Sequence, residues 1–197
     1  YSDETMTQLV ADIKSIVPGY VRISRVLRDI PPDYIVGGLK NSLRDIVKER
    51  MKQQGKECQC IRCREYGHRV REKRKVGEPR LVRTDYGAVG GKEVFLTFED
   101  EQGTLFGLLR LRLQNNPVAG LENSPSHPGP NGNVFALVRE LHIYGSEVPL
   151  KEHDDTAAQH KGLGKALLAE AERIAREAGA RQVAVLSGVG ARDYYRS

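Results

Sequence analysis

The sequence lacks any apolar run long enough to span a bilayer, and its mean hydropathy of −0.49 is typical of a soluble protein. Residues 1–10 carry no basic stretch followed by an apolar one, which is the pattern of a secretory signal, and the missing initiator Met is typical of an internal fragment. Cysteine is scarce, with three clustered residues, so a reducing compartment such as the cytoplasm is expected. The 197 residues, without internal repeats, suffice for one or two domains with a hydrophobic core.

Charge is distributed unevenly along the chain. Lys and Arg total 31 and Asp and Glu total 26, a net charge of +5, but residues 44–83 hold 14 basic against 6 acidic residues, or +8. The remainder therefore sums to −3. A basic segment on a nearly neutral body favours a polyanionic partner over a solvated, salt-bridged face.

The cysteines lie inside this basic segment. Cys58, Cys60 and Cys63 place three thiols within six residues, and soft thiolates on a tight loop suit tetrahedral zinc. The spacing C-x-C-x-x-C differs from the paired C-x-x-C of most zinc fingers, and His68 is a candidate fourth ligand that the spacing leaves open. An iron–sulfur cluster usually takes four cysteines, and unligated thiols prefer burial to a polar loop. We predict structural zinc.

Basic residues alternate with these cysteines and follow them. On a loop held by a metal they would face phosphates. The predicted nucleic-acid-binding residues are Arg62, Arg64, Arg69, Arg71, Lys73, Arg74 and Lys75.

A glycine-containing loop is the most specific motif. Residues 159–164, QHKGLG, fit the pattern Q/R-x-x-G-x-G/A and so resemble the pyrophosphate loop of the GCN5-related N-acetyltransferases. Glycines let the backbone approach a phosphate, and the N–H groups and dipole of a helix start attract its charge. The loop residues predicted to bind acetyl-CoA are Gln159, His160, Lys161, Gly162, Leu163 and Gly164.

The sequence around this loop predicts an α/β core. Apolar residues at helical spacing predict a helix over residues 165–178 that ends at Gly179, followed by a strand over residues 182–186. A further strand is predicted over residues 134–144. The order strand, phosphate loop, helix and strand is that of the acetyltransferase core. The alternative is that the glycines simply begin an amphipathic helix in some other α/β domain.

Earlier segments complete the expected layout. In the first part of the chain, we predict helices over residues 6–17 and 41–51, a strand over 20–27 and a basic cysteine loop over 58–75. Pro79 and Gly90-Gly91 are predicted to mark a linker-like boundary. After it we predict a hairpin of 93–98 with 103–113, a loop over 115–133 and a turn at 154–156.

Acetyl transfer needs a base for the acceptor and an acid for the leaving thiolate. Glu140 precedes the phosphate loop on a strand whose backbone can pair with the pantetheine arm, so Glu140, Leu141, His142 and Ile143 are predicted to contact the cofactor. Tyr194 and Tyr195 follow the next strand, and a phenol there can donate to the CoA sulfur. We predict Glu140, Tyr194 and Tyr195 as catalytic and cofactor-contacting residues, with a salt-bridged carboxylate and core tyrosines as the alternatives.

Several motifs together resemble the catalytic subunit of Elongator, a tRNA wobble-uridine acetyltransferase. The motifs are RELHIYG (139–145), QHKGLGKALL (159–168), SGVGARDYYR (187–196), CQCIRCRE (58–65), FLTFED (95–100), and YVRI with RDIP (20–23 and 28–31). The resemblance implies an α+β fold in three parts: residues 1–55 as the end of a radical S-adenosylmethionine domain, 56–80 as the zinc-binding basic loop, and 81–197 as a GNAT-type acetyltransferase domain lacking its final strand.

The resemblance also implies a reaction. Acetyl-CoA would be hydrolysed when the anticodon stem-loop of tRNA docks. The acetyl unit would then pass to a radical centre, which would attach a carboxymethyl-type group to C5 of the wobble uridine. The [4Fe–4S] cluster and S-adenosylmethionine would lie outside this chain, which has no further cysteine. A homodimer or other Elongator-type subunits are the expected protein partners, with no membrane. A protein lysine acetyltransferase and a non-catalytic tRNA-docking module stay open as alternatives.

Overall fold

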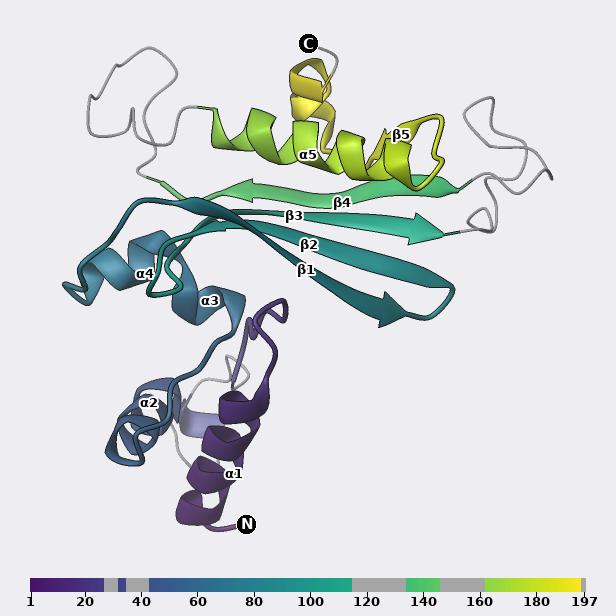
Figure 1. Ribbon diagram of the computed structural model, residues 1–197. Coiled ribbons are helices and arrows are strands. Elements are labelled where there is room, and N and C mark those ends of the chain that lie inside the picture. The colour runs from purple at the N-terminus through teal and green to yellow at the C-terminus, as the bar shows by residue number, and fades with distance from the viewer. Residues whose placement is uncertain (27–31, 35–42, 115–133, 146–161, 196–197) are drawn as a thin grey trace. The chain divides into compact units, whose positions relative to one another are not determined.

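The computed structural model describes residues 1–26, 32–34, 43–114, 134–145 and 162–195 (Figure 1). These residues form two compact units, Tyr1–Arg69 and Val70–Ser197. The three-part division predicted from the sequence stays a prediction. The predicted loop over residues 115–133 and the predicted turn at 154–156 lie outside the described residues.

The first unit is built on two helices, α1 (Asp3–Ile16) and α2 (Leu43–Gln53). The Ser2 hydroxyl accepts a hydrogen bond from the Thr5 backbone N–H, which caps α1 and satisfies one of its first N–H groups. Ala11 of α1 packs with Val47 and Met51 of α2 in a core that also includes the cysteine loop. Both helices agree with the sequence prediction.

Two sequence predictions for the first unit are wrong. Residues 20–26 form no strand, because among the described residues no neighbouring strand supplies a hydrogen-bonded ladder; Ile23 and Val26 instead pack against the helical core. The predicted basic loop contains two short helices, α3 (Ile61–Arg64) and α4 (Tyr66–Arg71). A short 3-10 helix, η1, spans Pro32–Tyr34.

The second unit is a mixed five-stranded sheet in the order β1-β2-β3-β4-β5. Its strands are β1 (Arg80–Ala88), β2 (Gly91–Glu99), β3 (Leu105–Gln114), β4 (Phe135–Ile143) and β5 (Val183–Val185). The first four are antiparallel, and β5 runs parallel to β4. The predicted β2–β3 hairpin and the strands at β4 and β5 are confirmed.

The linker-like boundary predicted at Gly90-Gly91 is wrong, because Gly90 lies in the turn between β1 and β2 and Gly91 is the first residue of β2. Gly90 has φ +76°, which an L side chain rarely adopts. A Cβ on Gly91 would lie 2.4 Å from the Leu113 carbonyl oxygen, so only glycine fits beside β3. The pair therefore connects β1 to β2 within the sheet.

The β2–β3 turn is organised by Asp100. Its carboxylate accepts hydrogen bonds from the backbone N–H groups of Gly77, Gln102 and Thr104 at 2.9, 2.9 and 2.8 Å. Burial alone would raise the pKa of Asp100, but the hydrogen bonds from Gly77 and Thr104 outweigh it and hold the pKa below its ordinary value. This ionised side chain fixes the hairpin that carries β3.

Helix α5 (Leu163–Glu177) lies across one face of the sheet (Figure 1). Leu167, Ala171 and Ile174 project from one side of the helix at spacings of three and four residues and enter the core with residues of β2, β3 and β4. At its end, the Gly179 N–H bonds the Arg176 carbonyl and the Ala180 N–H bonds the Ala175 carbonyl, a Schellman motif with Gly179 at φ +88°. The predicted helix and its terminating glycine are confirmed.

No helix in the described part of the chain is long and apolar enough to cross a membrane.

Candidate cofactor and metal sites

The start of α5 is shaped for an anionic ligand. Gly162 caps the helix at φ +96°, and the Ala166 N–H bonds its carbonyl at 2.9 Å. The first N–H groups of the helix therefore lack intrahelical partners and point outward, where the helix dipole is positive. The predicted contacts Gln159, His160 and Lys161 lie outside the described residues.

Beside this helix start, β4 and β5 separate. Their parallel pairing covers Ala136–Val138 and Val183–Val185 and ends with a hydrogen bond from the Leu186 N–H to the Val138 carbonyl. A β-bulge in the pairing of β3 with β4 lies at the same level, between Arg110 and Leu111, and bulges bend strands. Within the described residues, the β4 segment 139–143 has no strand on its β5 side. Its backbone edge is available to an extended ligand.

Tyr194 connects these two features. It lies in η4 (Asp193–Tyr195), which follows η3 (Val189–Ala191). A Cβ placed on Gly164 would lie 2.5 Å from the Tyr194 hydroxyl oxygen and 3.6 Å from Ile143 Cγ1. Three predicted cofactor contacts, Gly164, Ile143 and Tyr194, are thus brought together where β4 meets the first turn of α5.

The second predicted tyrosine supports the first. The rings of Tyr194 and Tyr195 meet edge to face with centroids 5.2 Å apart. Burial, with a contribution from Tyr194, raises the pKa of Tyr195, so this phenol is neutral near pH 7. The geometry places the Tyr194 hydroxyl, rather than that of Tyr195, against Gly164.

Glu140 is tied to a neighbouring arginine. Its carboxylate accepts a 2.9 Å hydrogen bond from Arg110 Nε, and Arg110 also donates to the Tyr86 hydroxyl and lies 4.9 Å from the Phe95 ring centroid. This arrangement corresponds to the salt-bridged alternative for Glu140. Arg110 was not among the predicted site residues, although it and Arg112 interrupt an otherwise mostly apolar strand, which was a visible signal.

His142 and Leu141 are neighbours of Glu140 on β4. His142 is exposed, and its ring centroid lies 4.4 Å from that of the buried Tyr144, with the two rings tilted by 44°. Leu141 packs partly against the sheet core. The alternation along the strand therefore directs His142 with Glu140 to one face and Leu141 with Ile143 to the face covered by α5.

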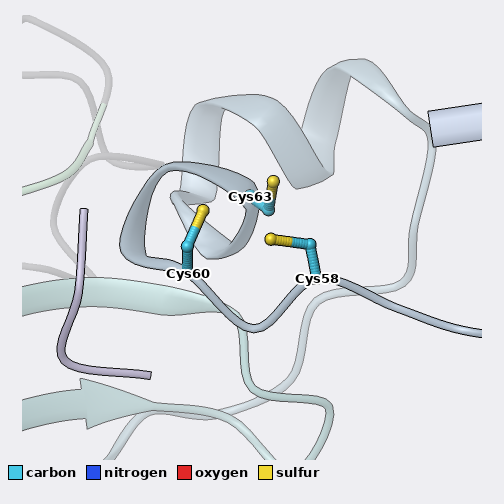
Figure 2. Close-up of side chains that lie close together, drawn as sticks. All are labelled: Cys58, Cys60 and Cys63. Atoms are coloured by element: carbon cyan, nitrogen blue, oxygen red, sulfur yellow. The ribbon is translucent and has the colours of Figure 1, made fainter. Parts of the chain in front are cut away.

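The three cysteines converge in the first unit (Figure 2). Their sulfur atoms lie within 4.8 Å of one another, and all three thiols are free. Three sulfurs bound to one tetrahedral zinc are about 3.8 Å apart, so small shifts would close the site. The cluster could hold a metal ion.

The electrostatics of the cluster favour a bound cation. Hydrogen bonds from Cys58 and Cys63 lower the pKa of the Cys60 thiol, whereas the interactions with Cys58 and Cys60 raise the pKa of Cys63. One thiolate therefore suppresses ionisation of its neighbour, as expected for like charges in a tight group. A cation among the sulfurs would remove this conflict.

His68 is not one of the clustered donors. Its Nε2 lies 3.6 Å from the Glu65 carboxylate, a contact between residues three apart along the chain. The described structure thus brings together three of the four predicted ligands. The role of His68 as the fourth ligand stays a prediction.

The predicted tRNA contacts divide into buried and exposed groups. Arg64 and Arg69 are 6% and 2% exposed: Arg64 donates to the backbone carbonyls of Gly19 and Gln59, and Arg69 donates to Glu57. These buried guanidinium groups donate to oxygens of the protein itself, and their predicted phosphate contacts stay a prediction. Arg62 is half-buried, whereas Arg71, Lys73, Arg74 and Lys75 are exposed.

Comparisons with known proteins agree with this geometry. Residues 64–197 match the acetyltransferase (GNAT) family, and the chain belongs to that family. A glycine-capped helix beside two separating strands is thus the core of an acyltransferase, and membership implies acetyl-CoA as its cofactor.

Particular relatives extend the similarity over the whole chain. A tRNA uridine(34) acetyltransferase of Dehalococcoides mccartyi strain CBDB1 is 58% identical over 198 residues, covering 100% of this chain and 42% of that protein. The human Elongator complex protein 3 is 44% identical over 200 residues, covering 100% and 35%. A solved structure, the archaeal Methanocaldococcus infernus Elp3 with an N-terminal deletion, matches with a TM-score of 0.82 at 40% identity, covering 100% and 46%.

These comparisons confirm the resemblance to the Elongator catalytic subunit stated from the motifs. They also set its extent, because the chain spans less than half the length of each of these three relatives.

Proposed function

We propose that this chain supplies acetyl-CoA binding and tRNA docking to an enzyme that modifies C5 of the wobble uridine in the tRNA anticodon. The 58% identity over the whole chain to a tRNA uridine(34) acetyltransferase is the observation that carries the proposal. A cofactor site in the second unit and exposed cations before β1 are the two features such an enzyme needs.

The cofactor's diphosphate would lie at the N–H groups that open α5, and its pantetheine arm would pair with the free edge of β4. When water attacks the acetyl carbonyl carbon and the C–S bond breaks, the Tyr194 hydroxyl would give its proton to the departing CoA thiolate. Glu140, oriented by Arg110, would order water or acceptor on the opposite face of β4. Tyr195 would hold the Tyr194 ring.

The cysteine cluster would bind structural zinc through Cys58, Cys60 and Cys63, since three soft thiolates with sulfur atoms within 4.8 Å of one another suit that ion. Zinc would cross-link the loop that precedes the exposed cations. The acetyl unit would pass to a radical centre outside this chain, in a reducing cytoplasmic setting, with other Elongator-type subunits or a second copy as partners.

Exposed cations before β1 should carry tRNA affinity. The double substitution Lys73→Glu and Lys75→Glu in the full-length protein is expected to weaken tRNA binding, because it replaces attraction to phosphate with repulsion. The slope of log K against log salt should fall by about one unit for each phosphate that is no longer bound. Fluorescence anisotropy with labelled tRNA at several salt concentrations measures both quantities.

The matched control is Arg176→Glu with Arg181→Glu, which makes the same charge change at exposed positions of α5 and the loop after it. Its tRNA affinity should exceed that of the lysine variant at every salt concentration. Equal affinity of the lysine variant and the wild type at fixed salt would contradict docking by this segment. Arg64 is unsuitable for this test, because its reversal would break buried hydrogen bonds.

A further inference from the structure

A lysine is buried beside the thiol cluster. Lys14 lies near the end of α1, its side chain is 3% exposed, and its Nζ is 3.7 Å from Cys63 Sγ. With Thr7 and Ala11 it forms the buried face of α1. Both partners belong to the first unit, so this contact lies within one compact body.

A buried ammonium group needs a compensating anion. Removing a charge from water costs several kcal/mol unless a partner of opposite charge offsets it. Among the described residues, the Lys14 ammonium group donates its hydrogen bond to Cys63 Sγ. By contrast, Lys56 contacts α1 from the surface, where it pairs with Asp12 at 2.9 Å and remains 38% exposed. A neutral thiol would compensate Lys14 poorly, whereas a metal-bound thiolate would compensate it well.

The net charge of the proposed metal site calls for a cation such as the Lys14 ammonium group. The charges of three thiolates and one Zn²⁺ sum to −1, and a buried site with that net charge is unstable without a counter-charge. One ammonium brings the sum to zero. It also supplies an N–H donor to one sulfur, the kind of supporting hydrogen bond that orients metal ligands.

We propose that Lys14 is a positioning residue of the metal centre, which donates a charge-assisted hydrogen bond to the Cys63 thiolate and neutralises the zinc trithiolate. The inference rests on the proposed zinc site. It links α1 to the metal loop: the helix supplies the counter-charge, and the metal keeps the buried ammonium compensated. Lys14 therefore acts through Cys63 and does not bind the metal.

The test compares zinc affinity in the full-length protein by competition with a chromophoric chelator. Lys14→Met, which keeps the length and loses charge and donor, should weaken zinc binding by about 10- to 100-fold. Lys14→Arg, which keeps both, should stay closer to the wild type than Lys14→Met. Lys92→Met makes the same substitution at an exposed lysine of β2, which pairs with Asp85 in the second unit, and should leave zinc affinity unchanged.

Each result decides between separate claims. A wild-type protein without zinc would overturn both the metal site and the role of Lys14. Zinc in the wild type with equal affinity in Lys14→Met would overturn only the lysine. An affinity loss as large in Lys14→Arg as in Lys14→Met would show that volume rather than charge matters, which also contradicts the proposal. Circular dichroism of each variant checks that it is folded.

Discussion

Replacement of Cys60 by serine is expected to lower the zinc content of the full-length protein from about one ion per chain at this site to near zero. Cys60 is fully buried, and its sulfur lies with those of Cys58 and Cys63. A serine hydroxyl is a hard, protonated donor that does not replace a thiolate, and two cysteines alone do not complete a structural site. Elemental analysis after gel filtration measures the effect.

Loss of the metal should also loosen the first unit. Cys58 and Cys60 belong to the core formed by Ala11, Val47 and Met51. Without zinc, the serine variant would leave a buried hydroxyl in this core, next to sulfur atoms that no metal holds together. Thr7→Ser, a buried substitution on α1 about 10 Å along the helix from Lys14, is the matched control and should retain zinc. Undiminished zinc in the Cys60→Ser protein would remove the metal assignment.

Valine at position 164 is expected to abolish measurable binding of acetyl-CoA in the concentration range where the wild type saturates. A Cβ there would meet the Tyr194 hydroxyl at 2.5 Å, and the branched side chain would also fill the space into which a phosphate approaches the helix start. Each hydrogen bond to a charged ligand that is broken costs about 1.5–3 kcal/mol. Breaking two of them corresponds to roughly a 100-fold or larger drop in affinity. Isothermal titration calorimetry provides the measurement.

Gly87→Val serves as the control for this substitution. Gly87 lies on β1 and is exposed, and a Cβ added to it would have no neighbouring atom within 4 Å, so valine fits the strand there. Acetyl-CoA affinity should be unchanged in that variant. Wild-type affinity in Gly164→Val would show that the first turn of α5 does not hold the cofactor.

The elements that the sequence predicted well are those whose apolar pattern matches the face they bury. In α5, Leu167, Ala171 and Ile174 enter the core as their spacing predicts, and Gly179 ends the helix at a positive φ. In β1, by contrast, no apolar alternation exists, because the strand is mostly exposed and carries Arg80, Arg83 and Asp85. Pairing with β2, rather than burial, holds β1 in the sheet.

Helix α1 shows the limit of pattern reasoning. Its existence follows from the spacing of apolar residues, but Leu9, Ile13 and Ile16 of that pattern are exposed in the structure, while Thr7, Ala11 and Lys14 are buried. The sulfur cluster selects this face, since it offers an acceptor to a lysine that periodicity alone assigns to solvent. A long-range contact of this kind, between residues 49 apart, has no local signature.

The candidate sites were predicted to different degrees for the same reason. Cys58, Cys60 and Cys63 are close in sequence, and their convergence follows from spacing. The burial of Arg64 and Arg69 could not be foreseen, because their acceptors include Gly19, 45 residues away, and the Glu57 side chain. Similarly, the approach of Tyr194 to Gly164 depends on how η4 returns to the start of α5.

The rate at which the full-length protein releases CoA from acetyl-CoA, measured with and without tRNA, distinguishes the proposed function from its alternatives. We expect tRNA to raise this rate and a lysine-containing histone peptide to leave it unchanged, because the proposed acceptor is a polyanion that docks on basic residues such as Lys73 and Lys75. Stimulation by the peptide alone would indicate a protein lysine acetyltransferase. No CoA release under either condition would indicate a non-catalytic docking module, and either result would contradict tRNA-dependent turnover of acetyl-CoA.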